Sequence, residues 1–121
     1  MTRGSRARTG AAALAGAAPV FAALGDRTRL RLVARLGAEG PLSITRLTAG
    51  TDVTRQAVAK HLRVLAGAGL AGSVAQGRER LWQLRPGPLE EVRRSLELIS
   101  RRWDESLSRL KAALEDEDRQ R

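Results

Sequence analysis

Residues 51–70 read TDVTRQAVAKHLRVLAGAGL and carry the clearest structural pattern in the chain. With Thr54 as the N-cap of a helix, Val58, Leu62 and Leu65 recur at steps of four and three residues and form a stripe that we expect to be buried. The other side of this helix is polar and basic. The pattern predicts a helix that docks on a core through its apolar stripe and leaves its polar side free for a partner.

The polar side of this predicted helix begins with Arg55, Gln56 and Lys60. Arg and Gln side chains can form paired hydrogen bonds with the edges of guanine and adenine in the major groove of DNA. A helix N-terminus also favours nearby phosphates, because its first amides lack partners and the helix dipole is positive there. Taken alone, this side fits a DNA-reading helix and a solvated charged surface equally well.

The segment before this helix favours the DNA-reading interpretation. Residues 43–49 predict a short helix that is capped by Ser43 and anchored by Ile44 and Leu47, and the next two residues, Gly50 and Thr51, supply a turn. Two short helices joined by a turn of a few residues are typical of a helix-turn-helix.

The segment after the helix predicts a β-hairpin. Residues 70–76 and 79–85 read as two short strands joined around Gly77 and Arg78, which places Arg78 and Arg80 at the hairpin tip. Exposed arginines at such a tip can reach a DNA phosphate or the minor groove. We expect Trp82 to pack beneath this hairpin rather than to stack on a base.

Three stretches resemble the ArsR/SmtB-type winged-helix repressors: FAALGDRTRLRLVARL at residues 21–36, VTRQAVAKHLRVLAGAGL at 53–70 and GRERLWQL at 77–84. The resemblance covers about residues 20–84 and continues less specifically through the last helix. It implies a mainly α fold with a small β-hairpin, a winged helix-turn-helix with a long C-terminal dimerisation helix. It also implies a DNA-binding function.

The resemblance and the polarity of the helix together give one set of candidate DNA contacts. This set is Ser43, Thr54, Arg55, Gln56, Ala59, Lys60, Arg63, Arg78 and Arg80. We expect Arg55, Gln56 and Lys60 to read bases, and the arginines at 63, 78 and 80 to hold the DNA backbone. Many relatives carry Ser where this chain has Ala59, so one hydroxyl contact is absent and the operator sequence cannot be transferred from the family.

Two helices are expected upstream. A short helix over residues 11–24 starts or is interrupted near Pro19 and ends at Gly25, and Asp26 then caps a helix that reaches about Gly37. In this second helix we expect three apolar residues to be buried and four basic residues to remain in water. The apolar residues are Leu30, Val33 and Leu36, and the basic ones are Arg27, Arg29, Arg31 and Arg35.

The last helix is predicted over residues 88–116 by apolar residues at steps of three or four. They are Leu89, Val92, Leu96, Ile99, Trp103, Leu107, Leu110 and Leu114. A helix of this length spans roughly 40 Å at about 1.5 Å per residue, which is more than a domain of this size can cover. We therefore expect a homodimer, although the stripe could instead pack on its own core, as its first part should do near Phe21 and Leu24. The candidate interface is Phe21, Leu96, Ile99, Trp103, Leu107, Leu110 and Leu114.

Composition agrees with a polyanionic partner. The chain has 22 Lys and Arg against 13 Asp and Glu, a formal charge of +9, and such a charge favours association with DNA. The length of 121 residues suits a single core. We expect a disordered basic tail over residues 1–10, one winged-helix domain over 11–117 and a frayed tail over 118–121.

Several classes of function are excluded by what the sequence lacks. With no Cys and a single His, His61, there is no nucleophile and base pair for an enzyme, no thiol switch and no zinc or arsenic ligand set, so we expect no catalysis, no metal and no cofactor. We expect His61 to be packed and hydrogen-bonded. The Ala-rich segment after Arg8 is too weakly apolar for a signal peptide, and no stretch is apolar enough to span a membrane. A cytoplasmic location is therefore expected.

These observations predict a homodimeric transcriptional repressor that binds an inverted-repeat operator and does not respond to metals. Two alternatives remain: a protein-interaction module that uses the last helix, and a DNA-binding protein without sequence preference. The effector that relieves repression, the operator and the target genes are not encoded in any motif of the chain.

Overall fold

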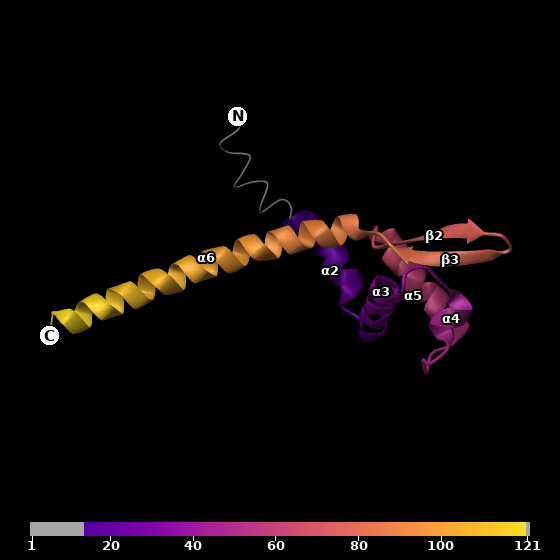
Figure 1. Cartoon of the computed structure of the whole chain (residues 1–121), viewed down its shortest axis with the longest axis horizontal. Helices are drawn as coiled ribbons and strands as arrows, with labels where there is room; N and C mark the ends of the chain where they lie inside the picture. Colours follow the sequence, from indigo (N-terminus) through magenta and orange to yellow (C-terminus); the bar gives the residue numbers. More distant parts are fainter. Residues whose placement is uncertain (1–13, 121) are drawn as a thin grey trace, which may run out of the picture.

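The computed structural model describes residues 14–120 and shows a small helical unit from which one long helix projects (Figure 1). The expected basic tail, the start of the first helix at residue 11 and residue 121 lie outside the described residues. The elements are α2 (Ala18–Leu24), α3 (Arg27–Glu39), β1 (Leu42–Ser43), α4 (Ile44–Thr48), α5 (Arg55–Gly67), β2 (Ala71–Gln76), β3 (Glu79–Leu84) and α6 (Pro86–Arg119). This arrangement is the winged helix-turn-helix that the sequence predicts.

The hairpin of β2 and β3 forms the wing, and their sheet contains one strand more than the two that the sequence predicts. In the described residues the sheet order is β1-β3-β2, all antiparallel, with Leu42 opposite Trp82 and Ser43 opposite Leu81. The two-residue β1 was not foreseen, because two residues carry no alternation that a sequence pattern could reveal. Gly77 opens the turn of the hairpin with a φ of 62°, a conformation that residues with a side chain rarely adopt.

The core lies where α5, α4 and α3 meet the sheet. Val58, Leu62 and Leu65 of α5 are completely buried, as expected, together with Leu47 of α4 and Leu70 before the wing. Trp82 on β3 is also buried and packs in the same cluster, which confirms its predicted place beneath the wing. Helix α5 is therefore held by its apolar stripe, with its other side exposed.

Helix α3 differs from the prediction in the side that it buries. Leu32 and Leu36 are buried and Val33 is half-buried, whereas Leu30 is half exposed. The expected set of Leu30, Val33 and Leu36 has a spacing of three, and successive members rotate by about 60° on a helix of 3.6 residues per turn. They cannot share one side. Two of the arginines expected in water, Arg29 and Arg35, are instead half-buried and hydrogen-bonded.

Helix α6 is longer than predicted and extends well beyond the rest of the molecule (Figure 1). It runs over Pro86–Arg119, 34 residues or about 50 Å, instead of residues 88–116. Residues 118 and 119, expected in a frayed tail, continue the helix because nothing after Asp116 breaks it. Only its first turns join the core, through buried Val92 and half-buried Leu89. Within the described residues, no helix is long and apolar enough to cross a membrane.

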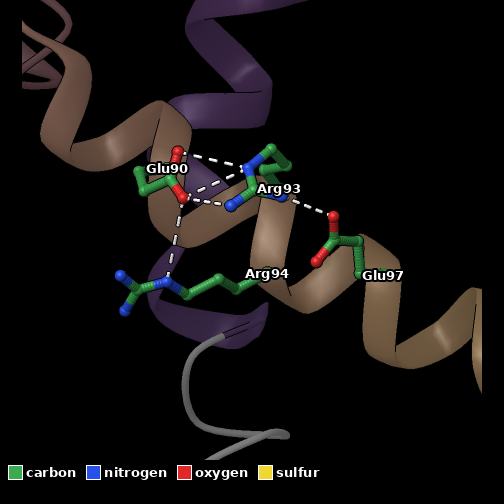
Figure 2. Close-up of polar contacts among 4 residues, drawn as sticks. All are labelled: Glu90, Arg93, Arg94 and Glu97. Atoms are coloured by element: carbon green, nitrogen blue, oxygen red, sulfur yellow. Dashed lines mark hydrogen bonds and ion pairs between the residues drawn. The ribbon is translucent and has the colours of Figure 1, made fainter.

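A charged network supports the first turns of α6 (Figure 2). Arg93 donates to the carboxylates of Glu90 and Glu97, one turn away on either side, and Arg94 lies 3.9 Å from Glu90. The hydrogen bond from Arg93 lowers the pKa of Glu90 below its ordinary value. At 100° per residue these four side chains lie on a different side of α6 from Leu89, Val92 and Leu96. The network therefore leaves the apolar stripe uncovered.

Replacing Leu65 with Ala tests the docking of α5. Because Leu65 is completely buried, Leu65→Ala should lower the free energy of unfolding by about 2–5 kcal/mol in urea titrations. The neighbouring Val64 is 40% exposed, so Val64→Ala on the same helix should change it by less than about 1 kcal/mol. Equal losses for the two variants would contradict the buried face assigned to α5.

Candidate nucleic-acid interface

Side-chain caps fix where the two helices of the helix-turn-helix begin. The Ser43 hydroxyl accepts a hydrogen bond from the amide of Arg46 at 3.2 Å, and the Thr54 hydroxyl accepts one from the amide of Ala57 at 3.1 Å. Each cap satisfies one of the amides that a helix start leaves without a partner. Both helices begin where the sequence predicted, and Thr54 keeps a hydroxyl hydrogen that it can donate to a phosphate.

The exposed side of α5 carries the polar residues singled out in the sequence. Arg55, Gln56, Lys60 and Arg63 are exposed, and Ala59 between them is half-buried. On a helix of 3.6 residues per turn these five positions span one continuous sector, and Val58, Leu62 and Leu65 occupy the remainder that faces the core. The sector is short and convex, with cationic and amide side chains, as insertion into a major groove requires.

Among the candidate contacts, Ser43 is the one whose side chain is buried. It is buried, with 8% of its surface exposed, and its hydroxyl is occupied as the cap of α4. Its backbone also pairs with β3. These contacts give Ser43 a structural role as a helix cap, and its contact with DNA stays a prediction.

Arg35 fastens α4 to α3, a role that sequence reasoning missed. Its Nη1 donates to the carbonyls of Arg46, Leu47 and Ala49 at 3.0, 3.2 and 3.4 Å, and its Nε donates to Glu39 at 2.8 Å. These carbonyls belong to the end of α4, where backbone acceptors lack helical partners. The Arg35 hydrogen bond also lowers the pKa of Glu39. The sequence predicts that Arg35 is exposed to water, and no sequence pattern indicates its contact with the end of α4.

The wing brings one further cationic side chain, Arg80, beside Arg55 at the start of α5. Arg78 and Arg80 are exposed, and Arg80 Nη1 donates to the Ser73 hydroxyl at 3.4 Å across the hairpin. A hollow lies between the wing and the helix-turn-helix. It is lined by Ser43, Ile44, Thr45, Arg55, Glu79 and Arg80. Thr45 and Glu79 thus stand next to two predicted contacts, although no sequence motif marked them.

His61 faces the protein rather than the exposed sector of α5. Its Nδ1 lies 3.3 Å from Nη1 of Arg29 and 3.9 Å from a carboxylate oxygen of Asp26. This confirms the expectation of a packed, hydrogen-bonded imidazole. Asp26 caps α3 by accepting from the amide of Arg29 at 3.0 Å. That hydrogen bond, with smaller contributions from the charges of His61 and Arg29, lowers the pKa of Asp26.

The residues predicted at a dimer interface are on the surface of the single chain. Phe21 is 40% exposed and Trp103 is 64% exposed, and Ile99 is half-buried. Leu96, Leu107, Leu110 and Leu114 are each about half exposed. From residue 100 to residue 120 every side chain is exposed, so this length of α6 has no partner within the described chain.

Residues 14–120 contain no group of three or more His, Cys, Asp or Glu side chains arranged to hold a metal ion. The single imidazole is engaged with Arg29, as described above. The acidic residues near the end of α6 are spread along an exposed helix and do not converge on one point.

Comparisons with known proteins point to one class. Residues 24–72 match a family model described as a helix-turn-helix domain. An HTH-type transcriptional regulator of Mycobacterium tuberculosis is 40% identical over 86 residues, 71% of this chain and 77% of that protein. Among solved structures, an ArsR-like transcriptional regulator from Rhodococcus sp. RHA1 is 40% identical, with a TM-score of 0.69 over 81% of this chain and 92% of that chain.

A third similar structure is a homodimeric winged helix-turn-helix DNA-binding domain from Mycobacterium bovis, a possible ArsR-family regulator. It is 25% identical, with a TM-score of 0.56 over 78% of this chain and 84% of that chain. These relatives are transcriptional regulators and not enzymes, in agreement with the sequence prediction.

The Asp26 cap predicts an acid-sensitive contribution to stability. Because the pKa of Asp26 is lower in the folded chain than in the unfolded chain, its contribution is complete above the unfolded pKa near 3.9 and is lost as the pH falls through the folded pKa. Urea titrations at fixed protein concentration between about pH 5 and 3 should show a steeper loss for the wild type than for Asp26→Asn. If the free energy of unfolding fell equally with pH in the wild type and in Asp26→Asn, the lowered pKa of Asp26 would be contradicted.

Proposed function

Because this chain belongs to the ArsR family of helix-turn-helix transcriptional regulators, we propose that it is a homodimeric repressor that binds an inverted-repeat operator and does not respond to metals. The observation that carries the proposal is the exposed sector of α5. Its apolar side is fully buried, so Arg55, Gln56 and Lys60 point outward from a docked helix, and Arg80 of the wing lies beside Arg55.

The exposed sector supports sequence reading and not only attraction to DNA. A protein that binds any duplex needs positive charge, which this chain has in excess. It has no use for an amide such as Gln56 between cations, whereas an amide that donates and accepts can pair with an adenine edge. In this proposal Arg55, Gln56 and Lys60 contact bases, while Thr54, Arg63, Arg78 and Arg80 contact the backbone.

The apolar stripe of α6 supports a homodimer. Trp103, Leu107, Leu110 and Leu114 lie in water on a helix that the rest of the chain does not cover, which is unfavourable unless another surface buries them. The M. bovis relative described as homodimeric is a precedent in the family. A two-fold dimer presents two recognition helices about 34 Å apart to successive major grooves, so the operator should be an inverted repeat. Occupying a promoter in this way would block transcription.

Competition between an operator selected from random duplexes and bulk genomic DNA at one salt concentration tests the proposal as a whole. A sequence-specific regulator should prefer the selected duplex by about a thousandfold or more. A preference of less than about tenfold would instead support a DNA-binding protein without sequence specificity.

Substitutions of Arg55 and Arg78 should separate base reading from backbone contact. Arg55→Ala should cost about 1–3 kcal/mol of binding to the operator and relax the preference at one base pair of each half-site. Arg78→Ala should weaken binding to all duplexes alike. It should also lower the slope of the logarithm of the binding constant against the logarithm of salt concentration by about one for each subunit, because one phosphate contact is lost. Electrophoretic mobility-shift titrations on operator variants measure both. An unchanged base preference in Arg55→Ala would contradict the role assigned to Arg55.

Placing a charge in the α6 stripe should weaken the dimer. Trp103→Glu should raise the dimer dissociation constant by about thirtyfold or more, equivalent to about 2 kcal/mol, in sedimentation-equilibrium experiments. Ser108→Glu adds the same charge to an exposed position about 140° away from the stripe and is the matched control. If the control dissociates the dimer as strongly as Trp103→Glu, or neither does, the stripe is not the interface.

Metal ions should leave operator binding unchanged. We expect Zn²⁺ or arsenite at one equivalent per subunit to release no DNA in fluorescence-anisotropy titrations, because the described residues offer no cluster of ligands for either. Stoichiometric release by either ion would refute this part of the proposal.

A further inference from the structure

We propose that Arg29 is a positioning residue that sets the orientation of the recognition helix, by tying His61 on α5 to the C-terminal end of α2. This inference rests on the proposed function, since it concerns how accurately α5 is presented to DNA. It assigns a role in sequence discrimination to a side chain that does not itself face the exposed sector.

One guanidinium joins three helices. From its place on α3, Arg29 donates through Nε to the carbonyl of Ala23 at 2.6 Å and through Nη2 to that of Ala22 at 3.5 Å. Its Nη1 lies 3.3 Å from Nδ1 of His61 on α5. The two carbonyls belong to the last turn of α2, and that of Ala22 also accepts from the amide of Gly25 at 3.2 Å. The planar fork of Arg can make such divergent contacts at once.

The contact requires one tautomer of the neutral imidazole. A guanidinium does not lose its proton, so it can only donate to His61, and Nδ1 must be the acceptor. The neutral ring then carries its hydrogen on Nε2. Asp26 is the acidic group beside this pair, 3.9 Å from Nδ1, and its amide partner is again Arg29. The three residues form one cluster at the junction of α2, α3 and α5.

The space between α2 and α5 beside Arg29 is an open hollow with small side chains and no aromatic or leucine residue. It is lined by Pro19, Ala22, Ala23, Arg29, Val64, Gly67 and Ala68. Val64, the largest apolar residue of the hollow, is 40% exposed. His61 lies about 40° around α5 from the buried Leu65, so the Arg29 contact holds one flank of the buried stripe and resists rotation of α5 about its own axis.

Rotation of α5 should affect base reading more than general attraction to DNA. His61 directly follows Lys60, so a change at His61 rotates the exposed sector as well. Base contacts require side chains within about 0.5 Å and about 10–20° of the productive geometry, whereas contacts to phosphate charge tolerate more. Loss of the Arg29 contact should therefore lower the preference for the operator and leave non-specific affinity nearly unchanged.

Arg29→Lys tests this directly, because it keeps the charge and removes the fork. The ratio of operator affinity to bulk-DNA affinity at one salt concentration should fall by about tenfold or more, while bulk-DNA affinity stays within about threefold of wild type. Arg27→Lys, an exposed position two residues earlier on α3, is the matched control and should leave the ratio unchanged. A wild-type ratio in Arg29→Lys, or an equal loss in Arg27→Lys, overturns the proposal.

A pair of His61 variants provides a second test that does not require Arg29→Lys to fold. His61→Asn places an amide oxygen near the position of Nδ1 and should retain most of the operator preference. His61→Leu removes the acceptor and should lose the preference as Arg29→Lys does. The double variant Arg29→Lys, His61→Leu should be no worse than either single variant. Equal behaviour of the Asn and Leu variants overturns the proposal.

The unmodified protein offers a third measurement. The ¹⁵N chemical shifts of His61 in the wild type should show a bare Nδ1 and a protonated Nε2 at about pH 9, where a neutral imidazole ring carries a single hydrogen. A hydrogen on Nδ1 would overturn the contact whatever the DNA-binding results. A wild type without any operator preference would instead count against the proposed function, and the imidazole shifts would still report on the Arg29 contact.

Discussion

The burial of one side of α5 is the constraint on which the rest of this structure depends. Val58, Leu62 and Leu65 have no exposed surface, so the helix cannot turn its polar side inward without exposing three large apolar side chains. This docking determines which residues face outward. The caps at Thr54 and Ser43, the Arg35 contacts with the end of α4 and the packing of Trp82 all add to the same placement.

Most of the DNA-binding unit could be predicted from sequence because its signals are local. The caps of α4 and α5 are single residues with a known preference, and the buried stripe of α5 follows the helical period. The hairpin follows from a Gly at its turn. Contacts between elements had no such signal. Strand β1 is two residues long, Arg29 and Arg35 are basic residues that look solvated, and the hydroxyl of Ser43 could cap a helix or contact DNA with equal ease.

The mistaken face of α3 has a different cause. Leu30, Val33 and Leu36 recur at a constant spacing of three, and only spacings that average 3.6 residues remain on one side of a helix. Leu32 and Leu36, four apart, satisfy that condition and are buried. The same rule makes α6 predictable: its apolar residues follow at steps of three and four that average close to 3.6, so they remain on one side of the helix from Leu89 to Leu114. Its ends were less certain, since charged helix-forming residues continue past the last Leu.

The central claim is that a dimer of this transcriptional regulator binds an operator through the exposed side of α5 in each subunit. Footprinting on the promoter of the protein's own gene tests this claim most directly. The account predicts two protected segments related by a dyad, with centres about one helical turn, or 10–10.5 base pairs, apart. A single protected segment without symmetry, or uniform protection along the DNA, would contradict it.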